Sequence, residues 1–399
     1  MNKYFFITLK RYIEQIIMFP FVVAGKIIAI LKPLDEEYDF FMFYPIYGIG
    51  GAEKINADVV AALPDKKIII FFTRHSPNDK LLHLFKKPNV TIKEIDKWTD
   101  NKFIYWANLM YRGTCAHYIN KQKKKPVVFN GQCNFAYKLF PHLRKDILKV
   151  ELIHTSHKPF AWVTFPYIPF IDKRVMYVDR VIRQCKEYYA EVGIPPRYGD
   201  RILNITNTVY VPLQYQEKSR AKNLKVYYAG RGGFQKHLEL VFEITRKCLL
   251  DKLDMEFHFA GTFENEIPAD IKGLVHWHGS IGKDEDIYKL HQDMDVLLMT
   301  SRFEGFPVAI MEAMSCGVAI VATAVDGIPE HIKDGVNGFM MHDMDDNKVV
   351  EDGISYLKKL ARDRALLDVI SRNNYEYAKK NYAKEVFVKA YRKAFELAD

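Results

Sequence analysis

The chain has 399 residues, of which 49% are hydrophobic and 14% aromatic, so it is expected to fold, and its length favours two domains over a single core. Its five cysteines are odd in number, widely spaced and free of any Cys-x-x-Cys motif, which argues against a disulfide framework or a zinc site and fits a reducing cytoplasm. The net charge of +9 is uneven, because residues 1–33 carry five Lys/Arg against one Glu and residues 80–125 carry eleven Lys/Arg against three acids. This basic front predicts an anionic partner, either a membrane surface or a phosphorylated substrate, rather than nucleic acid.

The first segment, residues 1–36, is both basic and apolar. Its longest uncharged apolar run, residues 16–25, is shorter than the roughly 20 residues that a membrane span needs, and no small-residue cleavage site of a signal peptide follows it. Three interpretations remain open: a helix lying in the lipid headgroup region, an ordinary packed helix, and a true anchor. We favour the first, because apolar burial and attraction to anionic lipid add together there. The expected location is therefore the cytoplasm, peripheral on the inner face of the cell membrane.

From residue 37, short apolar runs alternate with segments of helical length, which is typical of a parallel sheet with crossover helices. Most runs are continuously apolar rather than alternating, as expected of strands covered on both faces. The strands predicted for a first domain are residues 39–44, 67–73, 90–95, 127–130, 149–154 and 180–183.

A second series of strands follows the polar stretch at residues 214–222, which is interpreted as a linker. Its predicted strands are residues 224–229, 255–260, 275–278, 296–300 and 319–323, and helices are predicted at 346–360, 363–380 and 383–397. The prediction is an α/β protein of two Rossmann-like, doubly wound domains at residues 37–215 and 216–375. In such folds ligands bind beyond the carboxyl ends of the strands, here in a central cleft that the two domains face.

The segment at residues 301–317 (SRFEGFPVAIMEAMSCG) follows a predicted buried strand and contains Glu304 and Glu312. Pro307 suits a first helical turn, so a helix is predicted to start there and to end near Gly317. The free amides of such a helix start favour an anion such as a diphosphate, and Gly305 would let the backbone approach it closely. Glu312, about one turn into the helix, can accept hydrogen bonds from vicinal hydroxyls such as those of a ribose.

This segment resembles the retaining GT-B glycosyltransferases of glycosyltransferase family 4. Glu304 and Glu312 match the family's Glu-x7-Glu pattern, and the likeness continues through residues 319–330 (AIVATAVDGIPE) and 334–338 (DGVNG). The resemblance implies that Glu304, a candidate catalytic residue, contacts the donor sugar and that Glu312 binds the donor ribose. It also implies an acceptor domain at residues 37–215, a nucleotide-sugar donor domain at 216–375, and a closing helix at 376–399 that crosses back to the first domain. Residues 207–209 resemble a turn at the domain junction.

A glycine-rich loop at residues 229–236 (AGRGGFQK) follows the first strand of the second domain. It resembles the family's Gly-Arg loop, which implies that Arg231 and Lys236 hold the donor diphosphate, together with the backbone at Gly305, Phe306 and Val308. Positioned cations and helix amides can stabilise the charge of a leaving nucleotide without a metal. A loop with ordinary basic residues is the alternative.

Two further pieces lie in the first domain. In residues 47–53 (YGIGGAE), the resemblance implies that Gly50, Gly51 and Glu53 border donor and acceptor, although a mere tight turn is the alternative. In residues 153–157 (IHTSH), His154 is the preferred candidate catalytic histidine over His157, and a satisfied buried histidine is the alternative.

The resemblance implies transfer of a sugar from a UDP- or GDP-sugar to a hydroxyl of a saccharide acceptor, with retention at the anomeric carbon. The basic, apolar front suggests a lipid-linked acceptor in bacterial-type surface polysaccharide or glycoconjugate synthesis. No cofactor is expected, since the nucleotide-sugar is a substrate, and no metal, since residues 343–345 (DMD) fit a solvated acidic turn better than a metal site. The alternatives are a GT-B-like sugar-nucleotide epimerase or hydrolase, and a non-enzymatic nucleic-acid-binding protein.

Overall fold

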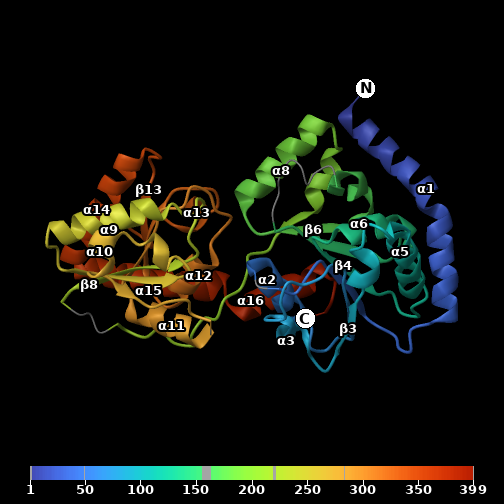
Figure 1. Ribbon diagram of the computed structural model, residues 1–399, viewed down its shortest axis with the longest axis horizontal. Helices are drawn as coiled ribbons and strands as arrows, with labels where there is room; N and C mark the ends of the chain where they lie inside the picture. The colour runs from blue at the N-terminus through green and yellow to red at the C-terminus, as the bar shows by residue number, and fades with distance from the viewer. Residues whose placement is uncertain (1, 49, 155–162, 219–221, 283, 399) are drawn as a thin grey trace. The chain divides into compact units, whose positions relative to one another are not determined.

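The computed structural model describes residues 2–48, 50–154, 163–218, 222–282 and 284–398. It divides into two compact units, of which the first comprises Met1–Ile205 and Phe387–Asp399 and the second Thr206–Val386 (Figure 1). The division falls before the polar stretch interpreted as a linker, because residues 206–215 already pack within the second unit. Thr208 Oγ1 donates to the Tyr382 carbonyl over 2.9 Å, and the Tyr375 hydroxyl donates to the Pro212 carbonyl over 2.8 Å.

The first unit is built on one parallel seven-stranded sheet of order β3-β2-β1-β4-β5-β6-β7. Its elements are α1 (Lys3–Leu31), β1 (Phe40–Tyr44), α2 (Gly51–Ala61), β2 (Ile68–Phe72), α3 (Leu82–Phe85), β3 (Val90–Glu94), α4 (Asp96–Thr99), α5 (Tyr105–Asn120), β4 (Val127–Gly131), α6 (Asn134–Leu139), η1 (Phe140–His142), β5 (Leu148–Leu152), η2 (Phe165–Phe170), β6 (Lys173–Met176), α8 (Asp179–Val192), η3 (Pro196–Arg201) and β7 (Ile202–Asn204). The parallel, doubly covered sheet confirms the predicted fold class.

One predicted strand of this unit is wrong. Residues 180–183 lie in helix α8, because the apolar side chains there recur at helical spacing and are buried at Ile182, Cys185, Tyr189 and Val192. The strand that occupies this part of the sheet is β6. Two of its four residues are charged, so it lacks the continuous apolar run used to predict strands. Its Arg174 is buried and pairs with the equally buried Glu151 of β5.

Helix α1 packs lengthwise against α5 in the first unit (Figure 1). The two backbones approach at a pair of glycines: a Cβ on Gly25 would lie 1.8 Å from the Met110 carbonyl oxygen, and one on Gly113 would lie 2.0 Å from that of Val22. The buried Arg11 donates from Nη1 to the Pro166 carbonyl over 2.7 Å. One face of α1 therefore belongs to the core of the unit. In the described part of the chain, α1 is also the one helix long and apolar enough to cross a membrane, by length and composition alone.

The last helix, α16 (Lys384–Ala394), completes the first unit. The rings of Phe387, Tyr391 and Phe395 join a core cluster with the sheet residues Phe40 and Phe129. The ring centroids of Phe40 and Phe395 are 5.1 Å apart. Residues Phe387–Asp399 thus belong to the first unit, whereas the predicted closing segment starts at residue 376.

The second unit holds a parallel six-stranded sheet of order β10-β9-β8-β11-β12-β13. Its elements are β8 (Leu224–Gly230), α9 (Leu238–Leu250), β9 (Met255–Gly261), η4 (Glu264–Glu266), α10 (Ala269–Lys272), β10 (His276–Trp277), α11 (Asp284–Asp293), β11 (Val296–Met299), α12 (Val308–Ser315), β12 (Ala319–Thr323), α13 (Ile328–His331), β13 (Gly338–Met341), α14 (Asp346–Arg362) and α15 (Arg364–Asn381). The predicted strands all appear, and β13 is an additional one.

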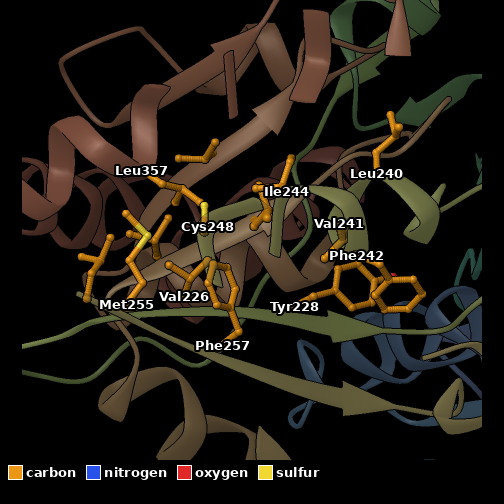
Figure 2. Close-up of a cluster of buried hydrophobic side chains, with 14 of the residues drawn as sticks. Val226, Tyr228, Leu240, Val241, Phe242, Ile244, Cys248, Met255, Phe257 and Leu357 are labelled. Atoms are coloured by element: carbon orange, nitrogen blue, oxygen red, sulfur yellow. The ribbon is translucent and has the colours of Figure 1, made fainter. Parts of the chain in front are cut away.

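The core of the second unit lies between the sheet and the helices α9 and α14. Figure 2 shows Val226 and Tyr228 of β8 and Phe257 of β9 beneath the side chains of α9, including Ile244 and Cys248. Because successive strand residues alternate between faces, the remaining residues of β8 and β9 face the other side of the sheet. The core thus fixes the strand ends from which the functional loops start.

We predict that Gly25→Ala destabilises the first unit. The new methyl group would meet backbone atoms of α5, and overpacking of this kind costs about 1–3 kcal/mol, which outweighs the better helix propensity of alanine. Gly51→Ala is the matched control, because a Cβ at Gly51 has nothing within 4 Å. Thermal unfolding followed by circular dichroism should show a lower transition temperature for Gly25→Ala alone. An unchanged transition would contradict the close helix contact.

Candidate functional site

The loop after β8 begins with a close approach of two strand ends. Gly230 of β8 is paired with Gly261 of β9, and a Cβ on Gly261 would lie 1.9 Å from the Gly230 carbonyl oxygen. Gly233, farther along the loop, has a φ of 98°, a conformation that favours glycine. The close strand approach and the positive φ therefore require glycine in and beside this loop. Without side chains there, the loop backbone is accessible at the carboxyl edge of the sheet.

Lys236, at the end of this loop, forms an ion pair with Glu304, which lies in the loop after β11. Both side chains are largely buried, with 14% and 7% of their surfaces exposed. Gln235 joins the pair, because its Nε2 donates to the Phe303 carbonyl over 3.0 Å and lies 3.4 Å from the second Glu304 oxygen. Two of the residues singled out in the sequence thus meet across loops from different strands.

The backbone around Glu304 is held by the loop after β12. The Glu304 amide donates to the Asp326 carboxylate over 2.7 Å, and the Gly327 amide donates to the Gly305 carbonyl over 3.0 Å. Asp326 adopts a φ of 45°, so this turn holds a non-glycine residue in the left-handed region. Asp326 is not among the residues predicted from the sequence, although its place in the loop that follows a buried strand was an available signal.

Helix α12 begins one residue later than predicted, at Val308, and Pro307 caps it in an extended conformation. The first amides of a helix have no carbonyl of their own helix to bind, so those of Val308 and Ala309 are available to an anion. The ring of Phe306 stacks on His331 with centroids 3.9 Å apart and is buried. The predicted end of the helix is confirmed, since Gly317 takes a left-handed φ of 66° just after it.

Glu312 lies in the middle of α12 with 12% of its side chain exposed. One of its carboxylate oxygens is 3.7 Å from Nε2 of the fully buried His291 on α11. The other ring nitrogen of His291 shares a hydrogen bond of 2.5 Å with the Tyr227 hydroxyl. His291 and Tyr227 were not singled out in the sequence, because nothing in the linear pattern links α11 to α12.

Arg231 is exposed at the start of the loop. Its carbonyl accepts a hydrogen bond of 2.7 Å from the Tyr228 hydroxyl. Burial raises the pKa of Tyr228, the Glu304 and Glu266 carboxylates raise it further, and the Arg231 guanidinium opposes them. Of the two predicted cationic residues of the loop, Lys236 pairs with Glu304, and Arg231 contacts Tyr228 through its carbonyl.

In the first unit, Gly50, Gly51 and Glu53 form the start of α2. The Glu53 carboxylate folds back over the loop, since a Cβ on Gly50 would lie 2.1 Å from its Oε2 atom. Burial raises the pKa of Glu53, and a hydrogen bond to its own backbone amide lowers it. Residue 49 lies outside the described residues, and the predicted binding role of this loop stays a prediction.

His154 follows β5 and is held on several sides. Its amide donates to Gln132 Oε1 over 2.8 Å, its carbonyl accepts from the Tyr177 hydroxyl over 2.6 Å, and its Nε2 is 3.2 Å from the Asn56 carboxamide oxygen. That oxygen can only accept a hydrogen bond, so Nε2 carries the proton of the neutral ring and Nδ1 keeps its lone pair. Nδ1 is buried and has no hydrogen-bond partner among the described residues. Burial lowers the pKa of His154 to about 4, so the ring is neutral at pH 7. His157, the other candidate, lies outside the described residues.

The acidic turn at residues 343–345 caps a helix. The Asp345 carboxylate accepts hydrogen bonds from the amides of Asn347 and Lys348 at the start of α14. Asp343 in turn accepts from the Asp345 amide over 2.9 Å. These carboxylates have a structural role in capping, in keeping with the interpretation as a solvated turn.

Residues 223–359 match the model of the glycosyl transferases group 1. The N-acetyl-alpha-D-glucosaminyl L-malate synthase of Bacillus anthracis is 30% identical over 212 residues, which cover 52% of this chain and 48% of that protein. The chain spans about half of the length of that relative, and it spans 30% and 37% of the length of two other curated relatives.

Solved structures extend the likeness to both units. The apo lipopolysaccharide outer core galactosyltransferase WaaB superposes with a TM-score of 0.67 at 18% identity and covers 90% of this chain and 98% of its own. HepE of Anabaena, solved with UDP and glucose, superposes with a TM-score of 0.67 at 15% identity. The match covers 90% of this chain and 99% of the HepE chain. At these identities the likeness shows the fold, which is GT-B. The matched family model contains the Glu304 to Glu312 segment, so residues 223–359 are similar to the group 1 glycosyltransferases, and both units share the GT-B fold of the solved structures.

Proposed function

We propose that the chain transfers a sugar from a nucleotide-diphosphate donor to a hydroxyl of an acceptor, with retention at the anomeric carbon. The observation that carries the proposal is the pairing of Lys236 with Glu304 beside the start of α12. A cation, a glycine-rich backbone and the free amides of a helix start are the groups that bind a diphosphate. The family match over residues 223–359 covers all of them.

In the proposed donor complex, Lys236, Arg231 and the amides near Val308 face the two phosphates. Charge develops on the leaving phosphate as the glycosidic bond breaks, and groups already in place stabilise it without reorganisation. Glu304 is then free to accept a hydrogen bond from the donor sugar, and Glu312 accepts from the ribose hydroxyls. The leaving phosphate oxygen takes the proton of the incoming hydroxyl on the same face, which accounts for retention.

The donor is proposed to be a UDP-sugar, with a GDP-sugar as the alternative. UDP occupies the Anabaena structure whose fold this chain shares. The acceptor is proposed to be a lipid-linked saccharide of a surface polysaccharide or glycoconjugate. The basic front of the chain and the apolar surface of α1 support this class of acceptor, because both favour an anionic lipid surface.

The apolar surface of α1 forms a continuous stripe. Phe5, Leu9, Tyr12, Ile16, Phe19, Val23, Ile27 and Ile30 recur at helical spacing, and all are exposed in the described structure. Ile16 is 74% exposed. Contiguous apolar surface of this extent marks an interaction site, and lysines at both ends of the helix suit anionic headgroups. We propose that α1 lies in the cytoplasmic face of the cell membrane with its glycine-bearing face held on α5.

Labelled UDP- and GDP-sugars incubated with the full chain and a bacterial membrane extract test the transfer reaction. We expect label to appear in extracted lipid or glycan only when both protein and extract are present. Release of free sugar without extract would instead indicate a hydrolase, and isomerised donor would indicate an epimerase. Tight, salt-dependent binding to RNA together with unchanged donor would contradict the proposal in favour of a nucleic-acid binder.

Glu312→Ala should weaken binding of UDP or GDP to the chain. The carboxylate is proposed to accept two ribose hydroxyls, worth about 1.5–3 kcal/mol, so we expect a loss of affinity of about 10- to 150-fold in calorimetric titration. Glu376→Ala, an exposed glutamate on α15, is the matched control and should bind as the unaltered chain does. Normal nucleotide affinity in Glu312→Ala would remove the proposed ribose contact.

The double variant Leu9→Glu/Ile16→Glu should lose binding to vesicles of phosphatidylethanolamine and phosphatidylglycerol. Both side chains are exposed, so the fold is retained while two charges enter the apolar stripe, and we expect at least about a ten-fold loss in sedimented protein. Leu250→Glu, on the exposed face of α9, is the control. Equal sedimentation of all three proteins would overturn membrane contact by α1, and resistance of the unaltered chain to alkaline extraction would indicate a true span.

A further inference from the structure

A cluster of three histidines and one glutamate lies at the edge of the second sheet, on strands β9 and β10, whereas Glu304 follows β11 and Glu312 lies on α12. Glu256 and His258 share one face of β9, and His276 is the direct neighbour of His258 on the edge strand β10. The rings of His258 and His276 stack with centroids 4.5 Å apart. Glu256, His258 and His276 each offer a ligand atom, and these three atoms lie within 4.8 Å of one another.

Glu256 and His258 each form a hydrogen bond to a residue outside the three ligands, through the atom that is not offered as a ligand. The Glu256 Oε1 atom accepts a hydrogen bond of 3.0 Å from Asn223, which leaves Oε2 at 3.8 Å from His258 Nε2. Nδ1 of His258 is hydrogen-bonded over 3.0 Å to Nε2 of His278. When His258 is the donor of that bond, its Nε2 atom carries a free lone pair directed to Glu256. Such a second contact, which fixes tautomer and ring orientation, is typical of histidine metal ligands.

His258 Nε2 is buried, and no hydrogen-bond partner for it exists among the described residues. The His258 side chain is only 9% exposed. Buried polar atoms in proteins are nearly always satisfied, so this nitrogen requires an explanation. Lys225 does not supply one, because its Nζ atom pairs with Asp293 over 2.7 Å.

We propose that Glu256, His258 and His276 bind a divalent transition metal ion, with Zn²⁺ as the best match. Two imidazoles and one carboxylate are ligands of zinc, which takes them at about 2.0–2.2 Å in tetrahedral geometry. His276 is exposed, so the ion has a route from solvent and its fourth position is open to water. The ion would tie the two-residue strand β10 to β9, and it would act in stability rather than in sugar transfer.

This site departs from the expectation of no metal, which rested on cysteine motifs and on the acidic turn at residues 343–345. Its ligands come from two strands whose register sets the contact. The inference is independent of the proposed transfer reaction, since none of its residues belongs to the proposed donor site.

Competition between the full, untagged chain and a chromophoric chelator for Zn²⁺ tests the site. We expect one Zn²⁺ per chain, a Co²⁺ derivative with the visible absorption of a tetrahedral ion, and a higher unfolding temperature with metal. His276→Ala and Glu256→Gln should each weaken Zn²⁺ binding at least about ten-fold. His342→Ala is the matched control, because His342 is also exposed and pairs with a single carboxylate, that of Asp334, over 2.7 Å.

Far-UV circular dichroism checks that each variant is folded. His276 is an exposed edge-strand residue, so its replacement should be tolerated, and Glu256→Gln decides the question if it is not. Absence of saturable Zn²⁺ binding would overturn the proposal. Zn²⁺ binding that survives in both ligand variants, or that falls in His342→Ala, would also overturn it.

Discussion

The proposed donor site depends on the buried ion pair between Lys236 and Glu304. Each charge would be costly to bury alone, so the loops after β8 and β11 must bring the two together whenever the second unit folds. Gln235 and Asp326 hold the same glutamate from either side, by side chain and by backbone. A buried ion pair contributes little net stability, so we propose that this one keeps the lysine in place for an incoming phosphate. In the same proposal, the free amides at the Val308 helix start bind that phosphate as well.

The sequence predicted the second unit well, because its strands are continuous apolar runs bounded by glycine-rich loops. Strand β12 has the predicted limits, and the turn at Gly317 ends α12 as predicted. In the first unit, β6 contains charged residues, so it did not look like a buried strand, and the sequence predicts the strand within α8 instead. The charge of Arg174 is buried because it pairs with Glu151. Contacts between distant segments, such as Glu312 with His291 or His258 with His276, depend on strand and helix register and could not be predicted from a single sequence.

Helix α1 shows how one segment can satisfy two of the interpretations left open by its composition. The face with Gly25 and Arg11 is packed into the first unit, as an ordinary core helix would be. The opposite stripe of large apolar side chains remains exposed, which is unusual for a folded unit surrounded by water. Docking on the protein and contact with lipid are therefore compatible, and the proposed lipid-linked acceptor would share the lipid surface to which α1 is proposed to bind.

The most direct test of the central claim is a crystal structure of the chain with a bound UDP-sugar. The account predicts that Lys236 Nζ lies within hydrogen-bond distance of a phosphate oxygen, that the amides of the first turn of α12 face the same diphosphate, and that Glu312 holds both ribose hydroxyls. A nucleotide bound elsewhere, with Lys236 still paired only to Glu304, would contradict it.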